Sequence, residues 1–204
     1  PIIHLRDSPL VGWASVQKRS FDVVGSALAL TAALPVLLVL TLGVIVSSGP
    51  PVLYRQKRMG LDGGMFSMLK LRTMRRDAEG SGPGWSQPED PRRTRFGTVL
   101  RRFSLDELPQ LWNVLKGEMS LVGPRPEQPE FIQEFRREIP SYMLRHKVKS
   151  GMTGWAQVHG LRGDTSMKAR IEHDIYYIQN WSMALDVKIL TMTIGSVLLD
   201  RNGS

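Results

Sequence analysis

The stretch Val23–Val46, VVGSALALTAALPVLLVLTLGVIV, decides the fold class, and it contains no charged residue. As a straight helix it would be about 36 Å long, against a bilayer hydrocarbon thickness of about 30 Å. A core helix of a water-soluble protein would carry a polar face over such a length. A signal peptide would have a shorter apolar run followed by a small-residue cleavage site. We therefore interpret the stretch as a helix that inserts into a membrane.

Pro35 lies near the middle of this stretch, where its ring removes one backbone donor and clashes with the carbonyl of Thr31. Basic residues flank the stretch on both sides: Lys18 and Arg19 before it, and Arg55, Lys57 and Arg58 after it. A helix that crossed the membrane once would place one of these groups outside, against the tendency of basic residues to stay on the cytoplasmic side. We therefore predict a re-entrant helix that bends at Pro35 and returns. A Pro-kinked spanning helix is the alternative.

The composition narrows the classes of protein that the chain could belong to. The chain has 204 residues, of which 42% are hydrophobic, and a formal net charge of +8. This length favours one domain with an appendage. The absence of Cys excludes disulfides, thiolate zinc sites and a cysteine nucleophile. The excess of basic residues indicates an anionic partner, which could be nucleic acid, a phosphorylated small molecule or an anionic membrane face.

The rest of the chain carries short strand and helix patterns between turn residues. Strands are expected at Pro51–Tyr54 and Met65–Leu71, and helices at Leu105–Leu115, Gln128–Glu138, Ile171–Trp181 and Ala184–Leu199. Residues 77–95, rich in Gly, Pro, Ser and charge, are expected to form a mobile loop. We predict a helix-rich α+β fold with interfacial amphipathic helices. It comprises an N-terminal linker (1–17), the re-entrant membrane helix (18–49) and a single cytoplasmic domain (50–204).

The adjacent carboxylates Asp106 and Glu107 are the first candidates for chemistry. On a helix, neighbouring side chains project about 100° apart, so these two would border one pocket rather than share a face. A structural alternative is a capping box, in which Ser104 caps a helix and Glu107 returns the hydrogen bond. That alternative explains Asp106 less well, beyond its favourable position near the helix dipole.

Several cations are candidates for binding phosphate groups. Lys70 and Arg72 would lie on the same face of a strand. Arg125 stands between Pro124 and Pro126, which restrict the backbone and so fix the direction of its guanidinium. A solvated edge strand and a turn with a solvated Arg are the alternatives.

The motifs that are missing are also informative. No HExxH, P-loop, GxGxxG after a strand or GxSxG occurs, which removes zinc and the commonest nucleotide-binding and hydrolase classes. Hard oxygen ligands favour Mg²⁺ if a metal is bound. A diphosphate substrate that meets a lipid phosphate at a membrane would use both the carboxylates and the cations, whereas nucleic acid would use the cations alone. A membrane-anchored nucleic-acid-binding protein and an inactive scaffold of a polymer-export complex remain the rival hypotheses.

The chain resembles the bacterial sugar transferases, the monotopic polyprenyl-phosphate phosphoglycosyl transferases, from Lys18 to about Leu199. The block SLDELPQLWNVLKGEMSLVGPRPE, residues 104–127, is the most specific part of the resemblance. Further matches are KRSFD (18–22), QKRMG (56–60), KLRTM (70–74), HKVK (146–149), GMTGWAQVHG (151–160), DIYY (174–177), NWS (180–182) and LD (185–186). Residues 1–17 resemble the segment before this domain in larger members, which indicates the catalytic domain of a longer protein. A naturally short enzyme is the alternative.

The resemblance implies transfer of a sugar-1-phosphate from a UDP-sugar to polyprenyl (undecaprenyl) phosphate with release of UMP. This would be the first membrane step of bacterial glycoconjugate or exopolysaccharide assembly. It implies that Asp106 is the nucleophile of a covalent phosphosugar–enzyme and that Glu107 handles the acceptor's proton or orients the pair. Lys70, Arg101 and Arg125 fall where the family binds substrate phosphates. Mg²⁺, in contact with Asp106, would neutralise the diphosphate.

The resemblance also implies partners and a location. The expected partners are a UDP-sugar, undecaprenyl phosphate and membrane lipids, with a homo-oligomer also considered and nucleic acid not expected. The expected location is the cytoplasmic face of the bacterial inner membrane. Pro35, Pro124 and Pro126 are expected to be structural. No motif in the sequence indicates which sugar is used, because selectivity depends on the shape of a pocket.

Overall fold

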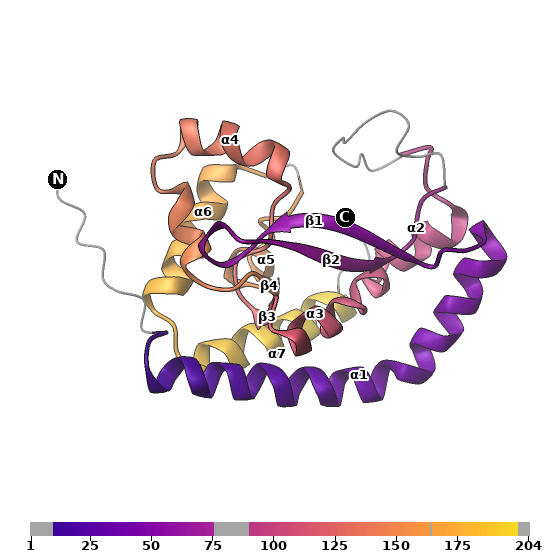
Figure 1. Ribbon diagram of the computed structural model, residues 1–204, viewed down its shortest axis with the longest axis horizontal. Coiled ribbons are helices and arrows are strands. Elements are labelled where there is room, and N and C mark those ends of the chain that lie inside the picture. The colour runs from indigo at the N-terminus through magenta and orange to yellow at the C-terminus, as the bar shows by residue number, and fades with distance from the viewer. Residues whose placement is uncertain (1–9, 76–89, 164, 200–204) are drawn as a thin grey trace.

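Helix α1 (Trp13–Ser48) is the longest element and forms one edge of the molecule (Figure 1). The computed structural model describes residues 10–75, 90–163 and 165–199, with side chains up to residue 196. The helix continues through Pro35 and begins at Trp13, earlier than the boundary at residue 18 that the sequence suggested. Within the described ranges, it is the one helix that is long and apolar enough to cross a membrane.

The apolar side chains of α1 are largely exposed. The exposed fractions of Leu28, Leu38 and Leu42 are 67%, 60% and 63%, and 11% of the most apolar stretch is buried inside the protein. A core helix of a water-soluble protein would bury these side chains, so that alternative is wrong. A continuous apolar surface of this length indicates association with a membrane.

Both ends of α1 pack on the same domain. Its first part contacts helix α3 (Gln110–Lys116) and strand β3 (Ser120–Val122). Near its end, Leu40 and Val44 pack against Leu71 and against Leu100 of helix α2 (Arg95–Arg102). Figure 1 shows that α1 bends, so that its last part turns towards α2. The helix therefore lies along the domain rather than projecting away from it.

Strands β1 (Leu53–Met59) and β2 (Met65–Leu71) form an antiparallel hairpin. Leu53 pairs with Leu71 and Met59 pairs with Met65, so the ladder is continuous over both strands. The predicted first strand, Pro51–Tyr54, was wrong in its bounds. Residues 55–58, which continue β1, are polar and show no alternation of apolar side chains, so the sequence does not mark them as a strand. Their pairing with β2 makes them extended.

Helices α2 (Arg95–Arg102) and α3 (Gln110–Lys116) are joined by a single 3₁₀ turn, Leu105–Glu107. The predicted continuous helix over Leu105–Leu115 is therefore wrong. Ser104 adopts a left-handed conformation with φ 53°, which ends the preceding turn, and the helix resumes only after Pro109. Proline has no N–H to donate, so a helix start, where that N–H would have no partner in the helix, suits it better than a helix interior.

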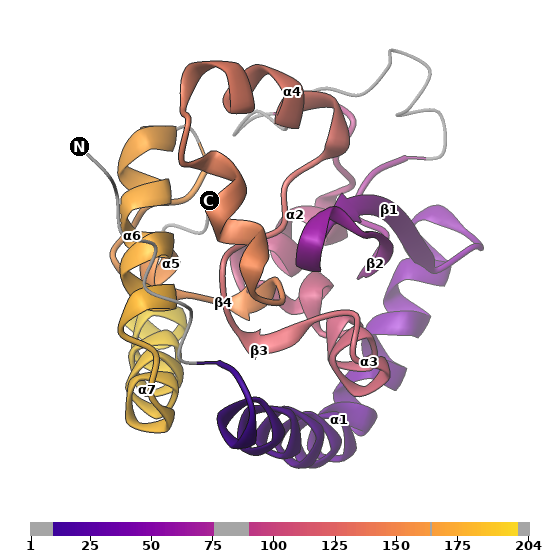
Figure 2. The same cartoon turned by 60° about the vertical axis from the view of Figure 1, so that its left-hand side comes forward.

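The remaining elements complete the domain (Figure 2). In chain order they are β3 (Ser120–Val122), α4 (Pro129–Glu138), a 3₁₀ segment (Tyr142–Lys147), β4 (Gly151–Thr153), α5 (Trp155–Val158), α6 (Met167–Gln179) and α7 (Met183–Leu199). Strands β3 and β4 pair in parallel. Figures 1 and 2 both show α4 on the side of the molecule away from α1. The helix-rich α+β class is confirmed, and residues 77–89 of the predicted loop lie outside the described residues.

The main core lies between α3, β3, α6 and α7. Its buried members include Val114, Met119, Val122, Tyr177 and Ile189. A second, smaller core joins the end of α1 to β2 and α2. Leu105 and Leu108 pack against this second core, so the turn that carries Asp106 and Glu107 is fixed beside the membrane-associated helix.

Candidate active site

Glu107 occupies the centre of a cluster of charged side chains. Its carboxylate accepts hydrogen bonds from Lys70 Nζ at 2.8 Å and from Arg125 Nη2 at 2.7 Å. Burial by itself would raise the pKa of Glu107, but the Arg125 and Lys70 cations outweigh it and hold that pKa well below its usual value. Glu107 is therefore an ionised anchor for two cations.

The capping box that the sequence offered for Glu107 does not form. Ser104 has left-handed backbone angles, and its side chain makes no capping hydrogen bond. An N-cap residue instead requires an extended backbone so that its side chain can reach the first turn. The carboxylate of Glu107 is thus directed to the cations of β2 and of the segment after β3.

Asp106 points into the same region but has different surroundings. It is buried, with 5% of its surface exposed. Burial raises the pKa of Asp106, while Lys70, Arg101 and Arg125 act in the opposite direction and Glu107 adds to the rise. Within the described ranges, no hydrogen bond to its carboxylate oxygens is found. Asp106 is therefore the carboxylate of the pair that remains available to a ligand.

Arg101 and Arg72 reach different positions. Arg101, in the last turn of α2, donates a hydrogen bond from Nε to Thr73 Oγ1 at 2.9 Å, and its charge acts on Asp106. Arg72 follows the end of β2, and no contact from it to either carboxylate is found in the described part of the chain. Lys70 and Arg101 thus flank the pair, whereas the convergence of Lys70 and Arg72 on one site stays a prediction.

Three hydrogen bonds accepted by backbone carbonyls fix the segment that carries Arg125. The carbonyl of Pro124 accepts from the Gly151 N–H at 2.9 Å, and that of Pro126 accepts from Arg58 Nη1 at 3.0 Å. The carbonyl of Arg125 itself accepts from Arg145 Nη2 at 2.9 Å. Arg125 is consequently held towards Glu107, and the alternative of a turn with a solvated Arg is wrong.

A buried ionic network behind Arg125 was not recognised in the sequence. Arg145, which is 2% exposed, pairs with Asp174 at 2.7 Å and lies 3.7 Å from Glu127. Glu127 also accepts from Arg170 at 3.1 Å. These residues come from three separate segments of the chain, so no local spacing marks them. Their role is to hold the Pro-rich segment, because Arg145 bonds both Asp174 and the Arg125 carbonyl.

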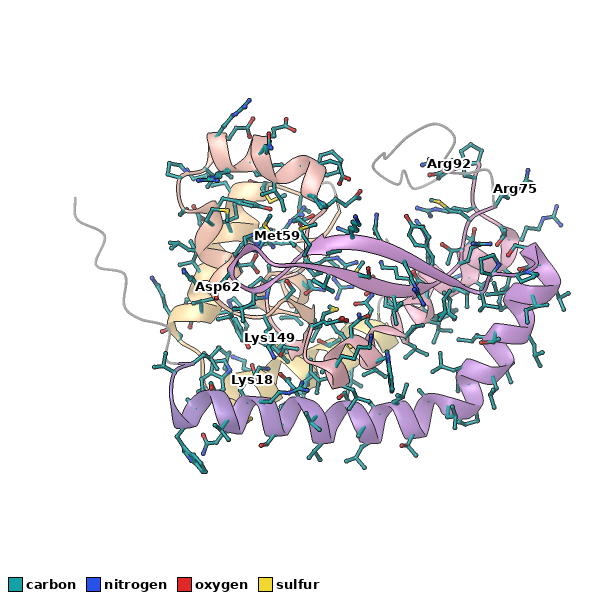
Figure 3. The ribbon with its side chains drawn as sticks, viewed as in Figure 1. Lys18, Met59, Asp62, Arg75, Arg92 and Lys149 are labelled. Atoms are coloured by element: carbon teal, nitrogen blue, oxygen red, sulfur yellow. The ribbon has the colours of Figure 1, made fainter. Side chains whose placement is uncertain are left out.

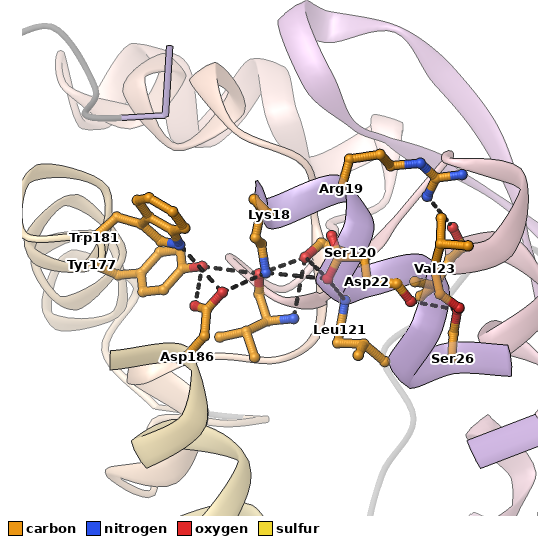
Figure 4. Close-up of polar contacts among 12 residues, drawn as sticks. Lys18, Arg19, Asp22, Val23, Ser26, Ser120, Leu121, Tyr177, Trp181 and Asp186 are labelled. Carbon is orange, nitrogen blue, oxygen red and sulfur yellow. Dashed lines mark hydrogen bonds and ion pairs between the residues drawn. The ribbon is translucent and has the colours of Figure 1, made fainter. Parts of the chain in front are cut away.

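Lys18 is buried and Arg19 is partly buried, and both are bonded within the domain. Figure 3 shows Lys18 on the side of α1 that faces the domain. Its ammonium group pairs with Asp186 at 2.7 Å and with Asp22 at 3.2 Å (Figure 4). Arg19 donates to the carbonyls of Val114 and Leu115, at the end of α3. Arg58 is likewise bonded within the domain, which leaves Arg55 and Lys57 as the exposed residues among the basic residues that flank the apolar stretch.

A metal at this site would rely on few protein ligands. Within residues 10–75, 90–163 and 165–199, no group of three or more His, Cys, Asp and Glu side chains is placed to hold an ion. Glu107 is engaged by cations, which leaves the Asp106 carboxylate. Mg²⁺ is commonly held by one or two carboxylates together with substrate phosphates, so the residues fit a metal that arrives with the substrate.

The site and the fold together define a class of protein: a membrane-associated domain with a buried carboxylate pair among cations that can bind phosphate groups. The chain belongs to the bacterial sugar transferase family, whose model matches residues 13–200. It is 44% identical, over 95% of its length, to the UDP-glucose:undecaprenyl-phosphate glucose-1-phosphate transferase of Escherichia coli, of which the match covers 43%.

Two further relatives differ in their named sugar and in length. The chain is 44% identical over 89% of its length to an N-acetylgalactosaminephosphotransferase of Aeromonas hydrophila that acts on undecaprenyl phosphate, covering 43% of that protein. It is 46% identical over 92% of its length to a UDP-glucose:undecaprenyl-phosphate glucose-1-phosphate transferase of Caulobacter vibrioides, covering 72% of it. The chain thus spans less than half the length of several curated relatives that it matches.

Proposed function

We propose that this chain transfers a sugar-1-phosphate from a UDP-sugar to undecaprenyl phosphate and releases UMP. The observation that carries the proposal is the contrast between the two carboxylates. Asp106 is buried and its oxygens have no hydrogen-bond partner in the described ranges, while Glu107 is held by Lys70 and Arg125. The names of the relatives, which include undecaprenyl-phosphate transferases for glucose and for N-acetylgalactosamine phosphates, support the same reaction.

Asp106 is the nucleophile in this proposal. One of its carboxylate oxygens bonds to the β-phosphorus while the bond from that phosphorus to the bridging oxygen breaks, so UMP leaves with the electron pair. In the second step, a phosphate oxygen of undecaprenyl phosphate bonds to the same phosphorus and the bond to Asp106 breaks, which restores the carboxylate. Lys70 and Arg125 hold Glu107, whereas no hydrogen bond within the described ranges holds the Asp106 oxygens, so Asp106 is the carboxylate of the pair that can approach the phosphorus.

The cations offset the repulsion between a carboxylate and an anionic phosphate. Lys70, Arg101 and Arg125 surround the carboxylate pair, and each affects the charge state of Asp106. Glu107 fixes Lys70 and Arg125 in place. Its low pKa makes it a weak proton acceptor, so of the two roles considered for Glu107 the positioning role is favoured. Mg²⁺, with Asp106 as its protein ligand, would neutralise the diphosphate.

The attachment of α1 at both ends supports a re-entrant arrangement at the cytoplasmic face of the bacterial inner membrane. The start of α1 is tied to α7 through Lys18 and Asp186, and its end packs on α2 through Val44 and Leu100. A helix that crossed the bilayer would place these two ends on opposite sides, away from one common domain. The turn that carries the carboxylates contacts the same end of α1, so a lipid phosphate can reach it from the membrane.

The reaction is tested by UMP release from a panel of UDP-sugars with undecaprenyl phosphate in nanodiscs. Asp106→Asn is expected to lower the rate by on the order of 10³-fold or more and to abolish the phosphosugar adduct on that residue, detected by mass spectrometry. The matched control is Asp62→Asn, because Asp62 is an exposed acid in the hairpin turn. Wild-type activity in Asp106→Asn, or no UMP from any UDP-sugar with the wild type, would refute the proposal.

The topology is tested with introduced cysteines, since the chain has none of its own. Ser15→Cys and Leu61→Cys place exposed thiols before and after the membrane segment. We expect a membrane-impermeant maleimide to label neither in intact cells and both in inverted membrane vesicles. Labelling of the two positions from opposite sides would show a spanning helix.

A further inference from the structure

A groove lies between α1, the β1–β2 hairpin and α3, which lie near one another at the lower right of Figure 2. Its volume is about 760 Å³. Leu30 of α1 lines the groove within the apolar stretch of that helix, and Trp112 of α3, which is 49% exposed, lines another side. The groove is thus continuous with the apolar surface of α1.

The hairpin separates this groove from the carboxylate pair. Side chains alternate between the faces of a strand, and all three β1 residues that line the groove are odd-numbered: Leu53, Arg55 and Lys57. From β2, the odd-numbered Met65, Ser67 and Leu69 line it, together with Phe66 near the hairpin turn. Lys70, with the opposite parity, contacts Glu107 on the other face. The groove is therefore a second site and not an extension of the first.

The lining of the groove combines three cations with apolar side chains. The cations are Arg55, Lys57 and Lys116, and none of them has an ion-pair partner among the described residues. The one acid in the lining, Glu118, accepts a hydrogen bond from Asn113 at 2.6 Å. The apolar lining is supplied by Leu30, Leu53, Met65, Leu69, Phe66, Pro109 and Trp112. The chemistry that matches this lining is an anionic head joined to an apolar chain.

We propose that this groove binds one anionic glycerophospholipid of the surrounding bilayer. Its phosphate would lie among Arg55, Lys57 and Lys116, and an acyl chain would lie along Leu30 and Trp112. The proposal rests on the membrane association of α1. The polyprenyl acceptor is not the occupant, because its phosphate must reach Asp106 on the other face of the hairpin.

The bound lipid would hold the hairpin against α1. No direct ion pair joins the exposed face of the hairpin to α1 in the described ranges, and Arg55 and Lys57 face the groove instead. A lipid phosphate would neutralise these like charges, which otherwise repel one another on adjacent positions of one strand face. Since β2 also carries Lys70 on its other face, the lipid would stabilise the strand that positions Lys70 beside Glu107.

The experiment measures lipid retention by the full chain. The protein is reconstituted in nanodiscs of phosphatidylcholine with 0 to about 30% phosphatidylglycerol, released, and examined by native mass spectrometry for bound phosphatidylglycerol. Each basic residue near an anionic surface contributes on the order of fivefold in affinity, so we expect Arg55→Gln/Lys57→Gln/Lys116→Gln to lower retention at least tenfold. Equal retention by this variant would overturn the proposal.

Two matched variants separate the groove from general charge and from misfolding. Arg136→Gln/Arg137→Gln/Lys168→Gln removes the same charge from exposed positions on α4 and α6 and is expected to retain the lipid like the wild type. Arg55→Lys/Lys57→Arg/Lys116→Arg keeps the charge and is expected to restore retention. Loss of retention in the distant variant, or no rescue by the charge-preserving one, would contradict a local binding site.

Further arms identify the occupant. We expect excess undecaprenyl phosphate not to displace phosphatidylglycerol, and the groove variant to keep its KM for undecaprenyl phosphate in pure phosphatidylcholine. Displacement or a raised KM would assign the groove to the acceptor, and a changed oligomeric state would assign it to a second copy of the chain. If the wild type retained phosphatidylglycerol but released no UMP, the proposed reaction would fail while the lipid site remained.

Discussion

Replacing Lys18 by Met tests whether the start of α1 is held by a buried ionic network. The change keeps the length of the side chain and removes the ammonium group, which lies 2.7 Å from Asp186 and 3.2 Å from Asp22. Both carboxylates are buried, with exposed fractions of 0% and 1%. Without Lys18, two anions would remain in the interior with no cation between them.

The size of the effect follows from the contacts that remain. Breaking a buried ion pair by removing one partner costs about 3–5 kcal/mol. Asp186 keeps hydrogen bonds from the Tyr177 hydroxyl and the Trp181 indole, and Asp22 keeps those from Ser120 and the Leu121 N–H (Figure 4). We therefore expect the lower end, about 3 kcal/mol. For a chain of this size that corresponds to a fall in Tm of about 6–12 °C.

Differential scanning fluorimetry in detergent micelles measures the fall. The matched control is Lys168→Met on an exposed position of α6, which is expected to stay within about 0.5 kcal/mol of the wild type. Adding Asp186→Asn to Lys18→Met removes one of the two unpaired anions, so the double variant is expected to be more stable than the sum of the single effects. An unchanged Tm in Lys18→Met, or strict additivity, would refute the buried network and favour a lysine that faces the membrane surface.

Three further predictions concern other parts of the domain. Burial, and secondarily the neighbouring Arg145, lower the pKa of His146 to about 4. Between about pH 6.5 and pH 4 the unfolded chain therefore binds a proton that the folded chain does not, and the free energy of unfolding should fall by up to about 1.4 kcal/mol for each pH unit of acidification. His146→Gln should flatten this pH dependence in Tm measurements. Gly43→Val places a side chain against the Phe96 ring, so we expect faster proteolysis at the end of α1 in micelles than for the wild type. Arg145→Met leaves Asp174 buried without its cation and is expected to lower Tm by at least about 6 °C, with an unchanged Tm contradicting the network.

The sequence predicted well where a local pattern is sufficient. The uncharged stretch of α1, the helix over α4 and the strand β2 follow from apolar spacing and turn residues, and the structure has all three. The sequence-based prediction failed where contacts with other segments, or the conformation of a single residue, decide the local structure. The outer half of β1 becomes extended through pairing with β2, and the interruption between α2 and α3 depends on the left-handed backbone at Ser104.

For the candidate site, the sequence likewise identified the residues but not their contacts. The sequence singled out Asp106, Glu107, Lys70, Arg101 and Arg125, and the structure brings them together. It did not indicate that Glu107 holds two cations while the Asp106 oxygens have no hydrogen-bond partner in the described ranges, because adjacent carboxylates look alike in a sequence. The capping box was a reasonable local hypothesis that only the backbone conformation excluded.

By itself, the sequence determined that the chain carries a membrane-associated helix and that its acids and bases suit phosphate chemistry. Both follow from residue type alone. A long uncharged apolar stretch is unfavourable in water, and buried carboxylates need cations beside them. Only the tertiary structure decided which charges serve which purpose. Lys18 is buried beside Asp186, Arg55 and Lys57 line a groove, and Arg125 faces Glu107, because the environment of a charge depends on segments distant in the chain.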